Sequence, residues 1–106
     1  MPRLTFIHPD GSQRIVDATV GKSVMEAARA NDVRGIRAEC GGECACSTCH
    51  CYVDTSWIGR LPPAKNDEAG LIEFAWEPKV GSRLTCQLLV TEALEGLVLH
   101  LPERQL

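Results

Sequence analysis

Six cysteines are the residues of this 106-residue chain best suited to chemistry, and four of them have the spacing of a metal site. Three lie close together in the pattern C-x5-C-x2-C, and the fourth follows after 36 intervening residues: Cys40, Cys46, Cys49 and Cys86. Four thiolates suit soft metal centres, which here means zinc or an iron–sulfur cluster. Structural zinc usually takes its thiolates as two C-x2-4-C pairs. One compact loop and one distant cysteine therefore favour a cluster held by a loop.

The residues between the loop cysteines suit a negatively charged group. A cluster with four thiolate ligands is an anion, and a pocket of low dielectric penalises that charge unless dipoles face it. Gly41 and Gly42 let the backbone approach closely, so that loop N–H groups can supply those dipoles. Ser47 and Thr48 could add hydroxyl donors to sulfur. The loop is therefore expected both to ligate the metal and to tune its reduction potential.

The remaining cysteines and the neighbouring histidine are expected to be structural. Cys44 lies inside the loop and is predicted to be a free thiol at a small-residue position, and Cys51 to be a buried small hydrophobe. A ligand role for His50 would need a second histidine, as in Rieske centres, but His8 and His100 lie far away in sequence. We therefore expect His50 to hydrogen-bond the loop to the domain core.

The apolar pattern and the turn residues predict an α+β domain around this loop. Ser23 is expected to cap the first helix, and Asn66 the second. In chain order, the predicted elements are strands at 3–8 and 13–18, a helix at 24–30, the cysteine loop at 40–49, a strand at 50–55, a helix at about 66–76, and strands at 83–90 and 96–101. Helices packed on one side of a sheet are the natural class for this order, although the pattern does not choose the topology.

Length, composition and charge exclude several functions. A chain of 106 residues with 44% hydrophobic residues fits one folded domain spanning 1–106. No stretch approaches the roughly 20 apolar residues of a membrane span, and no secretion signal is present. A reducing compartment is therefore expected, where clustered thiols bind metal. The net charge of −3 argues against a nucleic-acid partner, and no acid–base or nucleophile constellation indicates an enzyme.

The cysteine motifs resemble those of the adrenodoxin-type 2Fe-2S ferredoxins. The run CGGECACSTCH at 40–50 and the run RLTCQL at 83–88 carry the resemblance, with further similarity in GKSVMEAA at 21–28 and PERQ at 102–105. The similarity is greatest to the bacterial, putidaredoxin-like members that serve cytochrome P-450 monooxygenases. It implies a β-grasp fold and one 2Fe-2S cluster per chain, with Cys40 and Cys46 on one iron and Cys49 and Cys86 on the other.

The same resemblance implies an electron carrier. It would be a cytoplasmic monomer that moves one electron at a time from an NAD(P)H-dependent, FAD-containing ferredoxin reductase to a cytochrome P-450. A ferredoxin that supplies electrons to iron–sulfur cluster assembly is the alternative within this class. A structural zinc module acting as an interaction domain is the alternative from another class. Colour separates the classes, because a zinc protein lacks the visible absorption that bleaches on reduction.

Acidic residues in the second half of the chain indicate where partners would dock. Residues 39–106 hold ten acids and five bases, so a basic partner would meet its complement there. Acids in the first turn of a helix also complement its dipole, and others can form a solvated face. By resemblance to the family, we expect docking roles for Glu39, Asp67, Glu68, Glu73 and the C-terminal Leu106.

Overall fold

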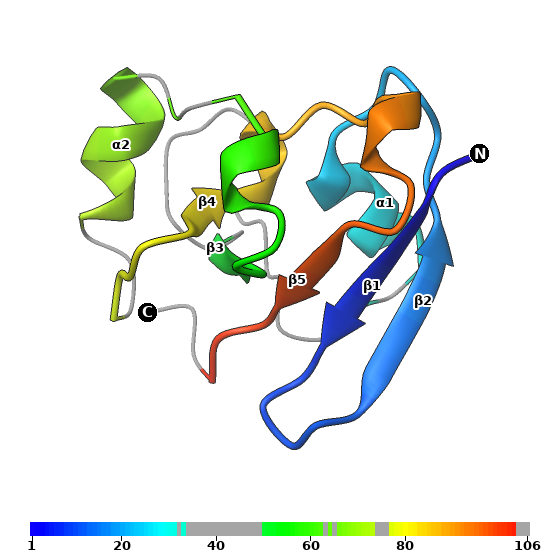
Figure 1. The fold of residues 1–106 in the computed structure, drawn as a ribbon, viewed down its shortest axis with the longest axis horizontal. Coiled ribbons are helices and arrows are strands. Elements are labelled where there is room, and N and C mark those ends of the chain that lie inside the picture. Colours follow the sequence, from blue (N-terminus) through cyan, green and yellow to red (C-terminus); the bar gives the residue numbers. More distant parts are fainter. Residues whose placement is uncertain (32, 34–49, 63, 65, 74–76, 104–106) are drawn as a thin grey trace.

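The computed structural model describes residues 1–31, 33, 50–62, 64, 66–73 and 77–103. Their arrangement is shown in Figure 1. In chain order the elements are β1 (Arg3–Ile7), β2 (Gln13–Asp17), α1 (Val24–Ala30), β3 (His50–Val53), the 3₁₀ helix η1 (Ile58–Arg60), α2 (Asn66–Ile72), β4 (Ser82–Leu84), the 3₁₀ helices η2 (Thr85–Gln87) and η3 (Glu92–Leu94), and β5 (Val98–His100).

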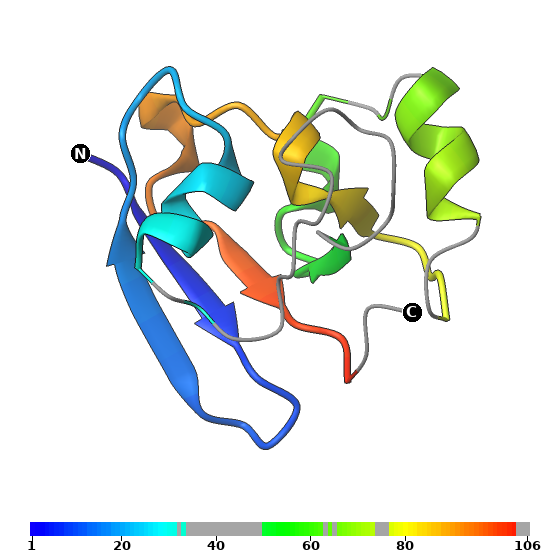
Figure 2. The ribbon, with the colours of Figure 1, turned by 180° about the vertical axis from the view of Figure 1, so that it is seen from behind.

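The strands of the described residues form one mixed sheet in the order β2-β1-β5-β3-β4. β1 and β5 are parallel, with Phe6 opposite Leu99, whereas the other neighbouring strands are antiparallel. The last strand of the chain therefore lies in the middle of the sheet. Helix α1 covers one face, as Figure 2 shows, and α2 lies beside the edge strand β4. This arrangement confirms the predicted α+β class.

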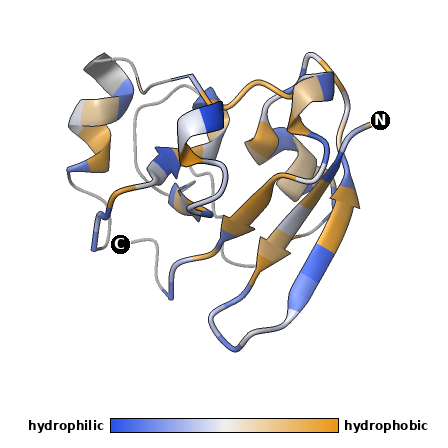
Figure 3. Cartoon of the chain, viewed as in Figure 1, coloured by the Kyte–Doolittle hydropathy of each residue, from blue (hydrophilic) through white to orange (hydrophobic). Residues whose placement is uncertain are grey.

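Alternation along β1 explains how the sheet builds its core. Leu4 and Phe6 point to the same side and are completely buried, as is Leu99 on β5. These side chains belong to one hydrophobic cluster with Val24 and Ala28 of α1. Figure 3 shows the hydrophobic residues along β5 and the adjacent part of β1. The core therefore lies between this region of the sheet and α1.

Helix α1 begins at the predicted cap. The Ser23 hydroxyl accepts a hydrogen bond from the Glu26 N–H at 3.1 Å, and the Glu26 carboxylate accepts one from the Ser23 N–H at 3.3 Å. This reciprocal pair is a capping box, which satisfies two N–H groups at the start of the helix. The cap fixes where the helix starts and hence which residues face the core.

The predicted strand at 83–90 is wrong after Leu84. β4 ends at Leu84, which stands opposite His50, the first residue of β3. The chain then turns through η2, and the Leu88 carbonyl accepts a hydrogen bond of 2.8 Å from the Val24 N–H at the start of α1. Leu88 and Val90 are buried, whereas Leu89 is exposed. The apolar pattern does not show which backbone partner such a segment takes.

The second helix differs at its ends from the prediction. α2 includes Asn66 instead of beginning after it, and it ends at Ile72. Glu73 is in the turn that follows, and residues 74–76 of the predicted helix lie outside the described residues. None of the helices in the described part of the chain is long and apolar enough to cross a membrane.

Gly81, just before β4, is predicted to be intolerant of a side chain. Its φ is +95°, and a Cβ there would lie 2.9 Å from the Val53 carbonyl oxygen and 3.0 Å from Cδ1 of Ile58. Gly81→Ala is expected to lower the free energy of unfolding by about 1–2 kcal/mol for the positive φ, with roughly 1–3 kcal/mol more for the clash. Urea denaturation measures this loss.

Gly11→Ala is the matched control for this substitution. Gly11 has φ +91°, but no atom lies within 4 Å of the position of its added Cβ. The Gly11→Ala variant should therefore lose only about 1–2 kcal/mol of its free energy of unfolding, which is the part due to the positive φ. Equal losses for the two variants would show that the Val53 carbonyl imposes no steric constraint.

Candidate metal centre

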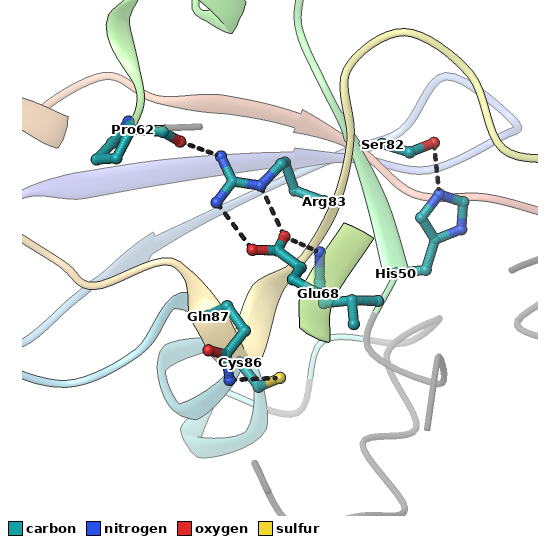
Figure 4. Close-up of polar contacts among 8 residues, drawn as sticks. His50, Pro62, Glu68, Ser82, Arg83, Cys86 and Gln87 are labelled. Atoms are coloured by element: carbon teal, nitrogen blue, oxygen red, sulfur yellow. Dashed lines mark hydrogen bonds and ion pairs between the residues drawn. The ribbon is translucent and has the colours of Figure 1, made fainter. Parts of the chain in front are cut away.

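Cys86 is the one predicted ligand that falls within the described residues, and it lies in η2 directly after β4. Its side chain is half-buried. The side-chain amide of Gln87 donates a hydrogen bond to Cys86 Sγ, with an Nε2–Sγ distance of 3.5 Å (Figure 4). An accessible sulfur that accepts an amide hydrogen bond is compatible with the predicted ligand role, because such donors stabilise a thiolate that binds metal.

The pairing of β3 with β4 brings the residue that follows the cysteine loop close to the residues before Cys86. Cys40, Cys46 and Cys49 lie outside the described residues. However, His50 directly follows Cys49, and it stands opposite Leu84, two residues before Cys86. This register is compatible with a site shared by the loop cysteines and Cys86.

His50 is buried at the start of β3, in agreement with its predicted structural role. Its side chain is 0% exposed, and Nε2 lies 2.9 Å from the Ser82 hydroxyl oxygen (Figure 4). That oxygen also accepts a hydrogen bond from the Lys79 N–H at 2.8 Å. Burial, and secondarily the charge of Lys79, lowers the pKa of His50 to about 4. A neutral imidazole thus joins β3 to the first residue of β4.

A buried ion pair holds α2 against β4. Glu68 accepts from the Arg83 guanidinium through both carboxylate oxygens, at 2.7 Å from Nε and 3.0 Å from Nη2 (Figure 4). It also accepts from the Leu84 N–H at 3.0 Å, while Arg83 Nη1 donates to the Pro62 carbonyl at 2.6 Å. Bidentate pairs of this kind fix geometry as well as charge. The pair therefore fastens three segments together close to Cys86.

The burial of Glu68 contradicts its prediction as a docking residue. Only 2% of Glu68 is exposed, so its carboxylate does not reach a partner. Its negative charge is compensated inside the protein by Arg83. In the sequence, Glu68 is indistinguishable from a surface acid in the first turn of a helix. No sequence signal links it to Arg83, which lies 15 residues away.

The structure describes the other expected docking residues to different extents. Glu73 is exposed in the turn after α2, as docking requires. Asp67 lies in α2, although its side chain is outside the described part of the structure. Glu39 and Leu106 lie outside the described residues altogether.

Cys51 has the buried position predicted for it. It is 0% exposed on β3 and belongs to the hydrophobic core, and this burial raises the pKa of its thiol. A thiol in such surroundings stays protonated and packs as a small hydrophobe. The prediction for Cys44 concerns a residue outside the described part of the chain.

Comparison with known proteins decides the family. Residues 7–91 match the model of the 2Fe-2S iron-sulfur cluster binding domain. The chain is 42% identical to rhodocoxin of Rhodococcus erythropolis over 106 residues, which covers 99% of each protein. The chain belongs to the 2Fe-2S ferredoxins. This ferredoxin therefore carries electrons through a 2Fe-2S cluster and is not itself an enzyme.

Solved structures agree with this assignment. The ferredoxin superposes on a ferredoxin from Rhodopseudomonas palustris HaA2 with a TM-score of 0.94 and 47% identity, covering 99% of this chain and 100% of the other. It also matches putidaredoxin in a covalent complex with putidaredoxin reductase, with a TM-score of 0.90, 38% identity, and coverage of 96% and 99%. The predicted resemblance to putidaredoxin-type ferredoxins and the β-grasp fold are confirmed.

Proposed function

We propose that this ferredoxin takes single electrons from an FAD-dependent, NAD(P)H-oxidising ferredoxin reductase and delivers them to a cytochrome P-450 monooxygenase. The match to putidaredoxin in its complex with putidaredoxin reductase is the observation that supports the reductase most directly. The P-450 acceptor is supported by the cysteine loop and its flanking motifs, which resemble those of the bacterial ferredoxins that serve such oxidases.

We propose Cys40, Cys46, Cys49 and Cys86 as the ligands of the cluster. Bound by these thiolates, a 2Fe-2S cluster supplies a centre that gains and loses one electron. The protein's part is to hold the sulfur atoms in place while the charge changes. The Glu68–Arg83 pair beside η2 supports this rigidity, because both partners are buried and bonded through several atoms. Outer-sphere transfer then needs no general base and no nucleophile.

Partner docking is proposed at Glu73 and Asp67, together with Glu39 before the first ligand and Leu106 at the C-terminus. The exposure of Glu73 supports the first of these positions. Charges at the rim of an interface act mainly on the rate of encounter and on its salt dependence. The ferredoxin must release each partner quickly, and weak electrostatic docking suits that requirement.

The Glu73→Gln variant is expected to bind the reductase about 1.4- to fivefold more weakly at low salt, because an exposed ion pair contributes roughly 0.2–1 kcal/mol. The effect should be seen as a higher KM for the ferredoxin with little change in kcat. The difference should become smaller near 0.5 M salt, where a Debye length of roughly 3–10 Å weakens the attraction between exposed charges. Reduction kinetics with a bacterial FAD-dependent ferredoxin reductase measure it.

Glu92→Gln is the matched control, because Glu92 is an exposed acid in η3, and the substitution removes the same charge. Its KM should stay at the wild-type value. Equal increases for the two variants would mean that only net charge matters, and would contradict a docking site at Glu73.

Turnover with defined partners tests the acceptor. NAD(P)H oxidation coupled to substrate hydroxylation should require the ferredoxin, the reductase and a P-450 together. If the reduced ferredoxin supported cluster synthesis on a scaffold protein but no P-450 turnover, iron–sulfur cluster assembly would replace the monooxygenase role.

We also propose that the protein works in the cytoplasm as a single-domain monomer. Metal-binding thiolates persist in a reducing compartment, which supports this location. Sedimentation of the holoprotein at micromolar concentration tests the monomer, and a species of twice the mass would contradict it.

A further inference from the structure

We infer that Gln87 tunes the electron affinity of the cluster, because its side-chain amide donates a hydrogen bond to Sγ of Cys86. The inference rests on the proposed role of Cys86 as a ligand. Gln87 itself is not expected to bind metal, because a neutral amide lacks the thiolate that soft centres prefer. Its role is to set the electrostatic environment of one ligand sulfur.

The backbone of η2 places the amide within reach of the sulfur. The Leu88 N–H donates to the Thr85 carbonyl at 3.3 Å, which closes the turn around Cys86 and Gln87. The Gln87 side chain then folds back, so that its Nε2 lies 3.5 Å from Sγ, as Figure 4 shows. Thr85 is completely buried, and η2 packs against α1, so this turn has a fixed position in the fold.

A donor at this place stabilises the electron-rich state. The sulfur of a metal-bound thiolate carries negative charge, and that charge grows when the centre gains an electron. Hydrogen bonds to charged acceptors are roughly twice as strong as those between neutral groups. The amide therefore stabilises the reduced state more than the oxidised one, and the reduction potential rises. Hydrogen bonds to ligand sulfurs are one of the general factors that set such potentials.

Gln87 can be substituted without loss of core packing. Its side chain is exposed, and it lines a hollow of about 550 Å³ whose walls also include Leu61 and Leu88. A substitution there therefore changes the hydrogen bond to Cys86 and leaves the buried residues in place.

Gln87→Met is the variant that tests the inference, because methionine has a similar length but no N–H donor. Its electron affinity is expected to fall three- to tenfold, which is about 30–60 mV at 59 mV per tenfold change for one electron. Gln87→Glu removes the donor and adds a negative charge, so its fall should be larger. Redox titration of the holoprotein measures both, and the Fe–S stretching bands in resonance Raman spectra should shift in both.

Gln13→Met is the matched control, because Gln13 is an exposed residue at the start of β2, and β2 lies at the opposite edge of the sheet from β4, which leads into η2. Its potential should equal that of the wild type. If the electron affinity of the Gln87→Met cluster were within twofold of the wild-type value, and the Raman bands were unchanged, the inference would be overturned. That result would leave the ligand role of Cys86 intact, since ligation is judged separately by cluster content in a Cys86 variant.

Discussion

Replacing Cys86 with alanine is expected to abolish stable binding of the 2Fe-2S cluster. Alanine has no group that can take the place of the thiolate, and the neighbouring Gln87 amide is not a ligand for iron. Iron and acid-labile sulfide per chain should fall to less than about a tenth of the wild-type content, an estimate for loss of one of four cluster ligands. The visible absorption that bleaches with dithionite should fall with them.

Cys51→Ala separates ligation from the mere loss of a thiol. Cys51 is buried in the core, and its substitution leaves a small cavity that costs about 1 kcal/mol. The cluster content of this variant should remain at the wild-type value. If Cys86→Ala retained full iron and sulfide, Cys86 would not be a ligand, and the four-cysteine site would have to be reassigned.

Glu68→Ala is expected to be the most destabilising substitution among the acidic residues. It leaves the Arg83 guanidinium buried without its carboxylate, and breaking a buried pair from one side typically costs 3–5 kcal/mol. The Leu84 N–H loses its acceptor as well. The melting temperature of the holoprotein should fall by more than about 10 °C, since roughly 4–8 °C corresponds to each kcal/mol in a domain of this size.

Two further variants show whether the pair itself is responsible. Glu73→Ala removes an exposed acid from the same region and should change stability by less than about 0.5 kcal/mol. In the double variant Glu68→Leu/Arg83→Met both charges are absent, so it should be more stable than Glu68→Ala. A Glu68→Ala protein as stable as Glu73→Ala would show that the ion pair makes no net contribution.

Local signals in the sequence predicted the parts of the fold that depend on neighbouring residues. Ser23 caps the first helix as expected, and the structure adds a reciprocal hydrogen bond with Glu26, three residues later. The hairpin of β1 and β2 follows from alternation and from the turn at Pro9-Asp10-Gly11-Ser12. Such signals are local because the hydrogen bonds that they describe close within a few residues.

The candidate site was less predictable, because it depends on contacts between distant segments. The cysteine spacing identified Cys86 as a ligand candidate, but the apolar pattern placed this residue in a strand instead of η2. Glu68 has the same local context as a surface acid, and only the position of β4 shows that it meets Arg83. The contact of Gln87 with Cys86 depends on the conformation of the turn, which the residue types do not specify.

The central place of β5 has a consequence for the biosynthesis of the protein. Residues 98–100 separate the β1–β2 hairpin from the β3–β4 pair, and they follow both of them in the chain. Until β5 has been synthesised, the two halves of the sheet have no strand to join them, and both β1 and β3 present open edges. Strand pairing over such sequence distances is slow to form. The nascent chain can therefore complete its sheet only after β5 has left the ribosome.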